Sequence, residues 1–335
     1  FGTAEADVLS EAVTYFYLAA FAYPCIMVFD ACGALFRGMG ESRIPLFGST
    51  VMCIVNVILN AVFIYGLRWG VFGAGLASLL AKAGGSALLL LFLADGQRQI
   101  SLRKVRMRLM DGQNALQRQQ MQKNILRLAI PMAMEDGVFH IGKLLVQGVV
   151  TSYGTTAIAA NAVALTIADF TQMPVYAMGL GLTTVIGQCI GAGEKEQARM
   201  YAKKILTVSF AVAALMSAST FIGSDVLTRM YRLTDETAAV TRQLIQFHAI
   251  ICGISWVFAF NIPCVLRAAS DVNFILIVSV FSMWTFRVGC SYLFRELLEV
   301  GVLSVWMAMG LDWIFRAAVY LWRLHGRTWT EKKFI

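Results

Sequence analysis

Long apolar stretches, separated by short polar segments, recur along the whole chain. Each is about 20 residues or longer, the length that an α-helix needs to cross a hydrocarbon core of roughly 30 Å. A β-barrel is excluded, because its strands would alternate apolar and polar positions over about 10 residues. The pattern predicts an all-α polytopic membrane protein with nine spans, at residues 12–35, 45–67, 70–94, 125–152, 156–190, 203–223, 241–266, 273–294 and 301–323.

The composition agrees with this class. The chain is 58% hydrophobic and 14% charged, whereas soluble domains carry about 25% charged residues. The net charge of +8 does not indicate a nucleic-acid partner, because the basic residues cluster in connections between spans, where they set membrane orientation. The positive-inside rule places the 95–124 loop and the C-terminus in the cytoplasm, and the acidic N-terminal piece with Glu5, Asp7 and Glu11 outside.

Two segments share one layout. Residues 35–45 (LFRGMGESRIP) and 265–274 (VLRAASDVNF) each end a helix with an arginine, Arg37 or Arg267, and continue with a small-residue turn and an acid, Glu41 or Asp271. Both lead into two further spans and leave toward the cytoplasm, which predicts a parallel repeat of the kind found in transporters. We therefore expect a partial N-lobe of three helices (1–94), a basic cytoplasmic linker (95–124) and a complete C-lobe of six helices (125–335).

The chain resembles the MATE family, the multidrug and toxic compound extrusion transporters. The matching pieces lie at 35–46, 56–66, 70–78, 129–139 (AIPMAMEDGVF), 152–164 (SYGTTAIAANAVA) and 178–202 (MGLGLTTVIGQCIGAGEKEQARMYA). The resemblance implies a two-lobe bundle of twelve helices, of which helices four to twelve are expected here. It also implies export of organic cations or other drugs in exchange for Na⁺ or H⁺, with no further cofactor.

The family's coupling acids do not transfer residue by residue. Well-known members carry one on the first helix of the N-lobe, which is expected to be absent here. The span 241–266, which corresponds to helix ten, contains no carboxylate, and Glu135 and Asp136 lie closer to Pro131 than the family pattern suggests. The site residues must therefore be predicted from this chain itself.

Four ionisable residues interrupt the apolar stretch 128–150, namely Glu135, Asp136, His140 and Lys143. Charges at bilayer depth cost at least about 2.5 kcal/mol each and usually face a cavity, a partner or a pathway. Asp136, His140 and Lys143 share one helical face, which favours a cluster that binds a cation or substrate. Two alternatives stay open: a network neutralised by His140 and Lys143, or a helix that begins at Pro131 and leaves the acids near the membrane surface.

Asp169, with Gln172 and Tyr176 on neighbouring turns, is a second candidate within the span 156–190. Asp30, Lys82 and Asp312 are weaker candidates that fit interlobe contacts equally well, and Asn56 and Asn60 fit hydrogen bonds between helices. No nucleophile motif, metal-binding spacing or phosphate-binding loop is present, so we predict neither catalytic nor metal-ligating residues.

These observations predict a secondary antiporter that exports small organic cations, as a monomer in the plasma (inner) membrane of a bacterium. One alternative is a flippase for lipid-linked saccharides with a related fold, whose anionic headgroup would require a cationic cavity. Another is an inactive membrane fragment.

Overall fold

The protein is helical throughout the part that the computed structural model describes, residues 6–95, 101–102, 115–326 and 329. The chain divides into two compact units, Phe1–Gln117 and Arg118–Ile335.

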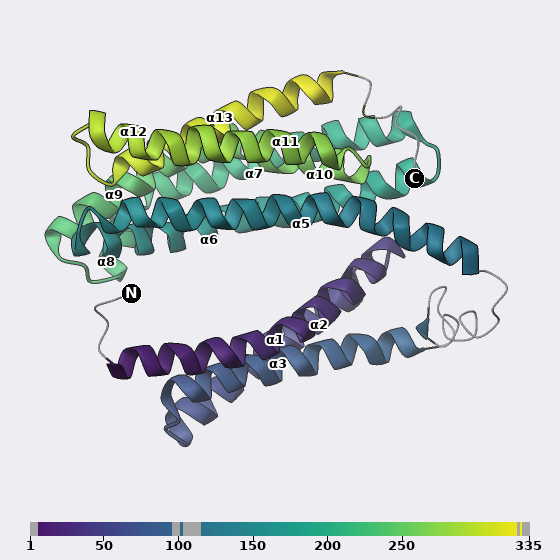
Figure 1. The fold of residues 1–335 in the computed structure, drawn as a ribbon, viewed down its shortest axis with the longest axis horizontal. Helices are drawn as coiled ribbons and strands as arrows, with labels where there is room; N and C mark the ends of the chain where they lie inside the picture. Colours follow the sequence, from purple (N-terminus) through teal and green to yellow (C-terminus); the bar gives the residue numbers. More distant parts are fainter. Residues whose placement is uncertain (1–5, 96–100, 103–114, 327–328, 330–335) are drawn as a thin grey trace. The chain divides into compact units, whose positions relative to one another are not determined.

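The first unit contains three long helices (Figure 1): α1 (Ala6–Gly38), α2 (Arg43–Asn60), which continues as the π-helix η1 (Ala61–Gly66), and α3 (Gly70–Ala94). Its buried core joins α1 to α3 through Phe36 and Leu89. The Asn56 side-chain amide donates to Ser78 Oγ at 3.4 Å. This bond confirms the predicted interhelical role of Asn56.

The second unit holds most of the chain (Figure 1). Its helices are α5 (Ala115–Thr151), α6 (Thr155–Gly191), α7 (Lys195–Ile222), the short α8 (Ser224–Met230) and α13 (Leu303–His325). Two further rods contain π-helical centres: α9 (Asp235–Ile251) passes through η2 (Cys252–Asn261) into α10 (Ile262–Ala268), and α11 (Val272–Ser282) passes through η3 (Met283–Gly289) into α12 (Cys290–Leu297). In the described residues, every predicted span therefore corresponds to a helical rod.

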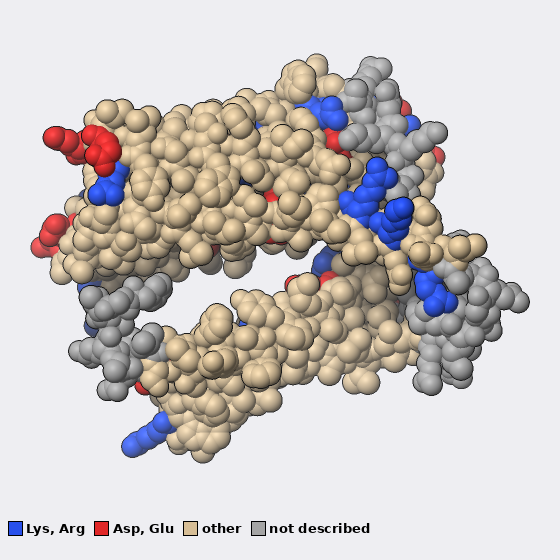
Figure 2. Space-filling model, in the orientation of Figure 1, with Lys and Arg blue, Asp and Glu red and all other residues tan. Residues whose placement is uncertain are grey.

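The helices have the length and composition of membrane spans. Among the described residues, seven are long and apolar enough to cross a membrane. The remaining two rods, α5 and α13, carry charged residues within their apolar stretches. Figure 2 shows the charged side chains of the second unit gathered toward the two ends of its visible flank, and the stretch between them is almost free of charge. The protein is thus a multi-pass membrane protein, as predicted.

Several predicted boundaries differ from the structure. α5 begins at Ala115, so Pro131 lies inside the helix and the alternative in which it starts the helix is wrong. α7 begins at Lys195 rather than at residue 203. Of the predicted linker, residues 96–100 and 103–114 lie outside the described part, as does Glu5 of the predicted external N-terminal piece.

The two copies of the predicted repeat share their turn geometry. The backbone N–H of each acid, Glu41 and Asp271, donates to the carbonyl five residues earlier at 2.9 Å. The residue before each acid has a left-handed backbone conformation, with φ of 82° at Gly40 and 62° at Ser270. Later in each copy, a glycine with positive φ stands in the last loop, with values of 52° at Gly70 and 60° at Gly301. Similar local sequence has therefore produced the same backbone twice.

Candidate functional site

Glu135 is neutralised inside the second unit. Its side chain is buried, with Oε2 accepting from Arg267 Nη2 at 2.9 Å and Oε1 accepting from Ser279 Oγ at 2.7 Å. From its place in the sequence, Arg267 is predicted only to belong to the basic connection after a span. The structure instead pairs this arginine with the carboxylate of α5.

The other predicted residues of α5 do not gather around Glu135. Asp136, His140 and Lys143 are exposed. His140 Nδ1 lies 2.8 Å from the backbone oxygen of Asp136 rather than from its carboxylate. Lys143 extends over the Phe139 ring, with Nζ 5.1 Å from the centroid. Glu135 therefore pairs with neither His140 nor Lys143. The alternative of a network neutralised by these two residues required such a pairing.

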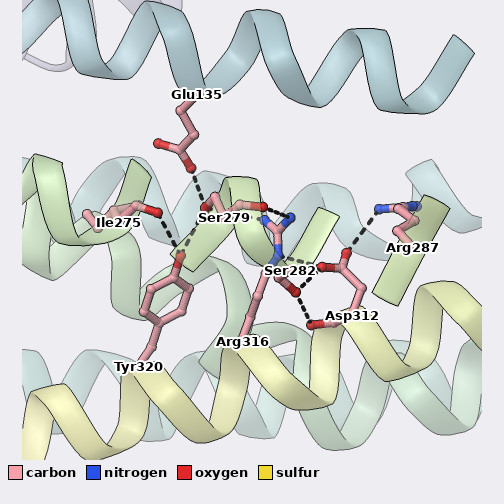
Figure 3. A network of polar contacts seen from close by, with 8 residues as sticks. All are labelled: Glu135, Ile275, Ser279, Ser282, Arg287, Asp312, Arg316 and Tyr320. Carbon is pink, nitrogen blue, oxygen red and sulfur yellow. Dashed lines mark hydrogen bonds and ion pairs between the residues drawn. The ribbon is translucent and has the colours of Figure 1, made fainter. Parts of the chain in front are cut away.

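Asp312, a weaker candidate, is the centre of a buried polar network (Figure 3). Its Oδ1 accepts from Arg316 Nε at 2.7 Å and from the Ser282 hydroxyl, while Oδ2 lies 3.5 Å from Arg287 Nη1. Two arginines thus share one fully buried carboxylate. The positive charge of this region exceeds what Asp312 can balance.

A chain of hydroxyl groups connects this network to Glu135. Ser279 Oγ lies 2.9 Å from Tyr320 Oη, and Arg316 Nη2 donates to the Ser279 carbonyl at 3.1 Å. Figure 3 shows these side chains bridging α5, α11 and α13. The network holds three helices of the second unit together and fixes the position of the Arg316 guanidinium.

A recess in the second unit lies next to this network. It consists of two cavities, of about 240 and 130 Å³, whose walls share Lys143, Leu165, Asp169, Arg287, Trp306 and Met309. The larger cavity also reaches Asn161, whose Oδ1 accepts from Trp306 Nε1 at 3.0 Å. The smaller reaches Gln172 and a group of aromatic side chains, namely Phe139, His248, Trp256, Phe260 and Trp313. We call this combined space the recess.

Three charged side chains from three different elements line the recess: Lys143 of α5, Asp169 of α6 and Arg287 of η3. Among the described residues, the structure gives the Asp169 carboxylate no ion pair and no side-chain hydrogen bond. Lys143 is attracted electrostatically by Asp169 and repelled by Arg287. The Phe139 ring faces Lys143, Arg287 and also Arg316, at 5.1, 5.5 and 5.2 Å from its centroid.

His248 forms the aromatic end of the recess. It is 1% exposed, and its ring meets Trp306 and Trp313 edge-on, at centroid distances of 5.7 and 5.6 Å. Its Nε2 lies 2.8 Å from Gln172 Nε2. An amide nitrogen can only donate, so with this assignment Nε2 accepts and the imidazole proton is on Nδ1. Nδ1 is buried without a hydrogen-bond partner within the described part of the chain.

The remaining candidates lie elsewhere. Tyr176 is 62% exposed and does not line the recess, although Gln172, one turn earlier, does. Asp30 and Lys82 belong to the first unit, where Asp30 is exposed.

Three residues of the second unit were not predicted as site residues from the sequence: Arg287, Arg316 and His248. Each interrupts an apolar stretch, which is the criterion that identified the α5 residues. The spacing of Asp312 and Arg316, one helical turn apart, also signals an ion pair. The same criterion, applied to every span, would have found all three.

Comparison with known proteins identifies the fold family. The family model MatE matches residues 131–293. The probable multidrug resistance protein YoeA of Bacillus subtilis is 21% identical over 332 residues, which are 96% of this chain and 70% of that protein. The probable multidrug resistance protein NorM of Thermotoga maritima is 22% identical over 342 residues, or 99% of this chain and 70% of its own length.

Solved structures show the same fold. The outward-facing conformation of a multidrug resistance MATE family transporter of the MOP superfamily aligns with a TM-score of 0.85 and 19% identity, covering 98% of this chain and 72% of that one. A MOP superfamily transporter from Pyrococcus furiosus, in which a reversed polarity of the binding pocket suggests a different function, aligns with a TM-score of 0.87 and 18% identity, covering 99% and 73%. The resemblance seen in the sequence is thereby confirmed: over nearly its whole length the chain is similar to MATE family transporters, and it has their fold.

Proposed function

We propose that this protein exports organic cations, including drugs, across a bacterial plasma membrane in exchange for inward Na⁺ or H⁺. The relatives named as multidrug resistance proteins support the export of drugs. The observation that carries the proposal is the Asp169 carboxylate, which lines an aromatic recess and has no ion pair among the described residues.

The recess suits an organic cation on two grounds. Asp169 supplies a negative charge at intramembrane depth, where ion pairs are screened less than in water. The indole and phenyl rings around it, including Trp306 and Phe139, attract cations through their faces, with about 0.5–2 kcal/mol per favourable contact. Each of the two cavities, of about 240 and 130 Å³, is smaller than known ligand pockets, which measure roughly 300–1,000 Å³.

Exchange follows from competition at one carboxylate. Asp169 cannot hold a coupling ion and the cationic group of a drug at the same atoms. Binding of one therefore weakens binding of the other, and this reciprocity applies to both ligands equally. A protein that moves between two faces of the membrane only when this carboxylate is occupied would exchange the two cations.

The presence of Lys143 and Arg287 in the recess also favours a second candidate, the lipid-linked saccharide flippase, because its substrate has an anionic headgroup. The size of the recess argues against it. Two cavities of about 240 and 130 Å³ fit a small drug better than a saccharide headgroup attached to its lipid.

The test is ethidium export from a drug-sensitive bacterial host. Asp169→Asn should abolish resistance and efflux at normal expression, whereas Asp136→Asn should retain both, since Asp136 does not line the recess. In vesicles, imposing a Na⁺ or a pH gradient separately identifies the coupling ion. Wild-type efflux by Asp169→Asn would refute the proposed role of this carboxylate.

A further inference from the structure

A further cavity, of about 660 Å³, lies in the second unit where α7 begins and α13 ends. None of the described residues that line it also lines the recess. Its volume exceeds that of either cavity of the recess and falls within the roughly 300–1,000 Å³ of known ligand pockets. We call it the end groove and define it by Lys203 and Phe210 of α7, Phe258 of η2, and Leu321 and His325 of α13.

Basic side chains stand at one end of the end groove. Arg199 and Lys203 lie one helical turn apart near the start of α7, and His325 is the last residue of α13. Arg199 Nη1 contacts Glu196 Oε1 at 2.8 Å, whereas the exposed Lys203 has no ion pair within the described part of the chain. Glu196 is the one carboxylate that lines the groove among the described residues. This end of the groove therefore carries a net positive charge.

Away from these basic residues the end groove is apolar. Leu206 and Phe210 follow Lys203 on the same face of α7, and the helical rise puts Phe210 about 10 Å further along the axis. The Phe210 ring stacks on Phe258, with centroids 5.5 Å apart. On α13, Leu321 lies one turn before the basic end of that helix. Both helices therefore change from basic to apolar in the same direction along the groove.

The basic end of the groove is expected at a membrane surface. α7 is long and apolar enough to cross a membrane, and the positive-inside rule predicts that its beginning faces the cytoplasm. Trp329 also lines the groove there, is 3% exposed, and donates from Nε1 to the Leu324 carbonyl at 3.1 Å. Tryptophan is enriched at membrane–water interfaces. The basic residues are thus expected at the depth of the lipid headgroups, with the apolar part of the groove at the depth of the acyl chains.

We propose that the end groove binds an anionic phospholipid from the surrounding bilayer. Its phosphate group contacts Arg199, Lys203 and His325, since arginine and lysine donate charge-assisted hydrogen bonds and even a neutral imidazole has one N–H donor. An acyl chain covers Phe210 and Leu321, which are 39% and 40% exposed. A soluble phosphate compound would leave this apolar wall uncovered, and a lipid without net charge would leave the basic end unbalanced. Basic pockets between membrane helices on the cytoplasmic side are typical sites for anionic headgroups.

The test compares phosphatidylglycerol with phosphatidylcholine of the same acyl chains, because only the first carries a net negative charge. Binding to the purified full chain in detergent is measured by native mass spectrometry. The wild type should bind phosphatidylglycerol about tenfold more tightly, and Lys203→Gln should weaken that binding about fivefold while changing phosphatidylcholine by less than about twofold. The matched control is Lys204→Gln, the next lysine of α7, which is exposed but does not line the end groove and should change neither. Leu321→Asn should weaken both lipids.

Three outcomes would overturn the inference. If the wild type binds the two lipids equally, or if Lys203→Gln and Lys204→Gln weaken phosphatidylglycerol equally, the basic residues act only through general attraction to anionic lipid. If glycerol 3-phosphate displaces phosphatidylglycerol at equal concentration, the groove takes a soluble phosphate compound. If Leu321→Asn leaves phosphatidylglycerol binding unchanged, no acyl chain lies in the groove. None of these results bears on the recess, so ethidium export tests the proposed function separately.

Discussion

Neutralising Asp312 should destabilise the second unit strongly. The carboxylate is fully buried, accepts a 2.7 Å hydrogen bond from Arg316 and lies 3.5 Å from Arg287. Asp312→Asn would leave two buried guanidinium groups facing each other without an anion. Breaking a buried ion pair by removing one partner costs about 3–5 kcal/mol, and repulsion between the two arginines places this site at the upper end of the range.

Glu135→Gln provides the comparison. Its partner Arg267 is 28% exposed on its side chain, so water can reach the guanidinium that the substitution frees. The glutamine can still accept one of the two hydrogen bonds. We expect a loss of about 1.5–3 kcal/mol, the value of hydrogen bonds to charged groups. Asp136→Asn, at an exposed carboxylate, should stay within about 0.5 kcal/mol of the wild type.

The assay is chemical unfolding of the purified protein in detergent, followed by tryptophan fluorescence and gel filtration. The unfolding midpoints should fall in the order Asp136→Asn, Glu135→Gln, Asp312→Asn, from most to least stable. Adding Arg316→Met to Asp312→Asn should recover part of the loss, because one unpaired cation is removed with its carboxylate. An Asp312→Asn protein within about 1 kcal/mol of the wild type would show that the buried charges do not depend on this carboxylate.

Two further predictions concern packing. Gly142→Ala should destabilise the protein by about 1–3 kcal/mol through overpacking, because a Cβ there would lie 2.9 Å from Cγ of the fully buried Met283. Gly137 has open space around it. Gly137→Ala should therefore be neutral or stabilise the protein by up to about 1 kcal/mol. Equal unfolding midpoints for the two variants would contradict the close approach of α5 and η3. His248→Phe should keep the contacts with the neighbouring indoles but lose the hydrogen bond to Gln172, for a cost of about 1 kcal/mol in stability. His248→Ala should cost at least twice as much in the same unfolding assay. The reversed order of the two variants would argue against the aromatic packing.

The fold was largely predictable from the sequence, because membrane spans depend on local properties. An apolar run of sufficient length becomes a helix in lipid whatever its neighbours, since every backbone polar group must find a partner within the helix. The turns before Glu41 and Asp271 were predictable for a similar reason. A small residue followed by an acid recurs in both copies, and the structure gives both the same backbone hydrogen bond.

The site was less predictable, because contacts between distant helices decide it. Sequence spacing placed Asp136, His140 and Lys143 on one helical face, but it did not reveal that Glu135 pairs with Arg267, 132 residues later in the chain. The π-helical stretches add to the difficulty. In η3, which contains Arg287, the residues do not follow the ordinary helical period, so the facing of this arginine could not be read from a 3.6-residue pattern.

The distinction between paired and unpaired charges changes how mutational data on this protein must be interpreted. In the sequence, the adjacent acids of α5 look equivalent, and a double neutralised variant would seem a direct test of transport. In the structure, Glu135 is bonded to Arg267 and Ser279, whereas Asp136 is exposed. Loss of drug resistance in the double variant would therefore combine a stability defect with any effect on transport. Asp169, whose carboxylate has no ion pair within the described residues, can be neutralised without stranding a buried cation, so resistance measured on Asp169→Asn at normal expression reports on binding itself.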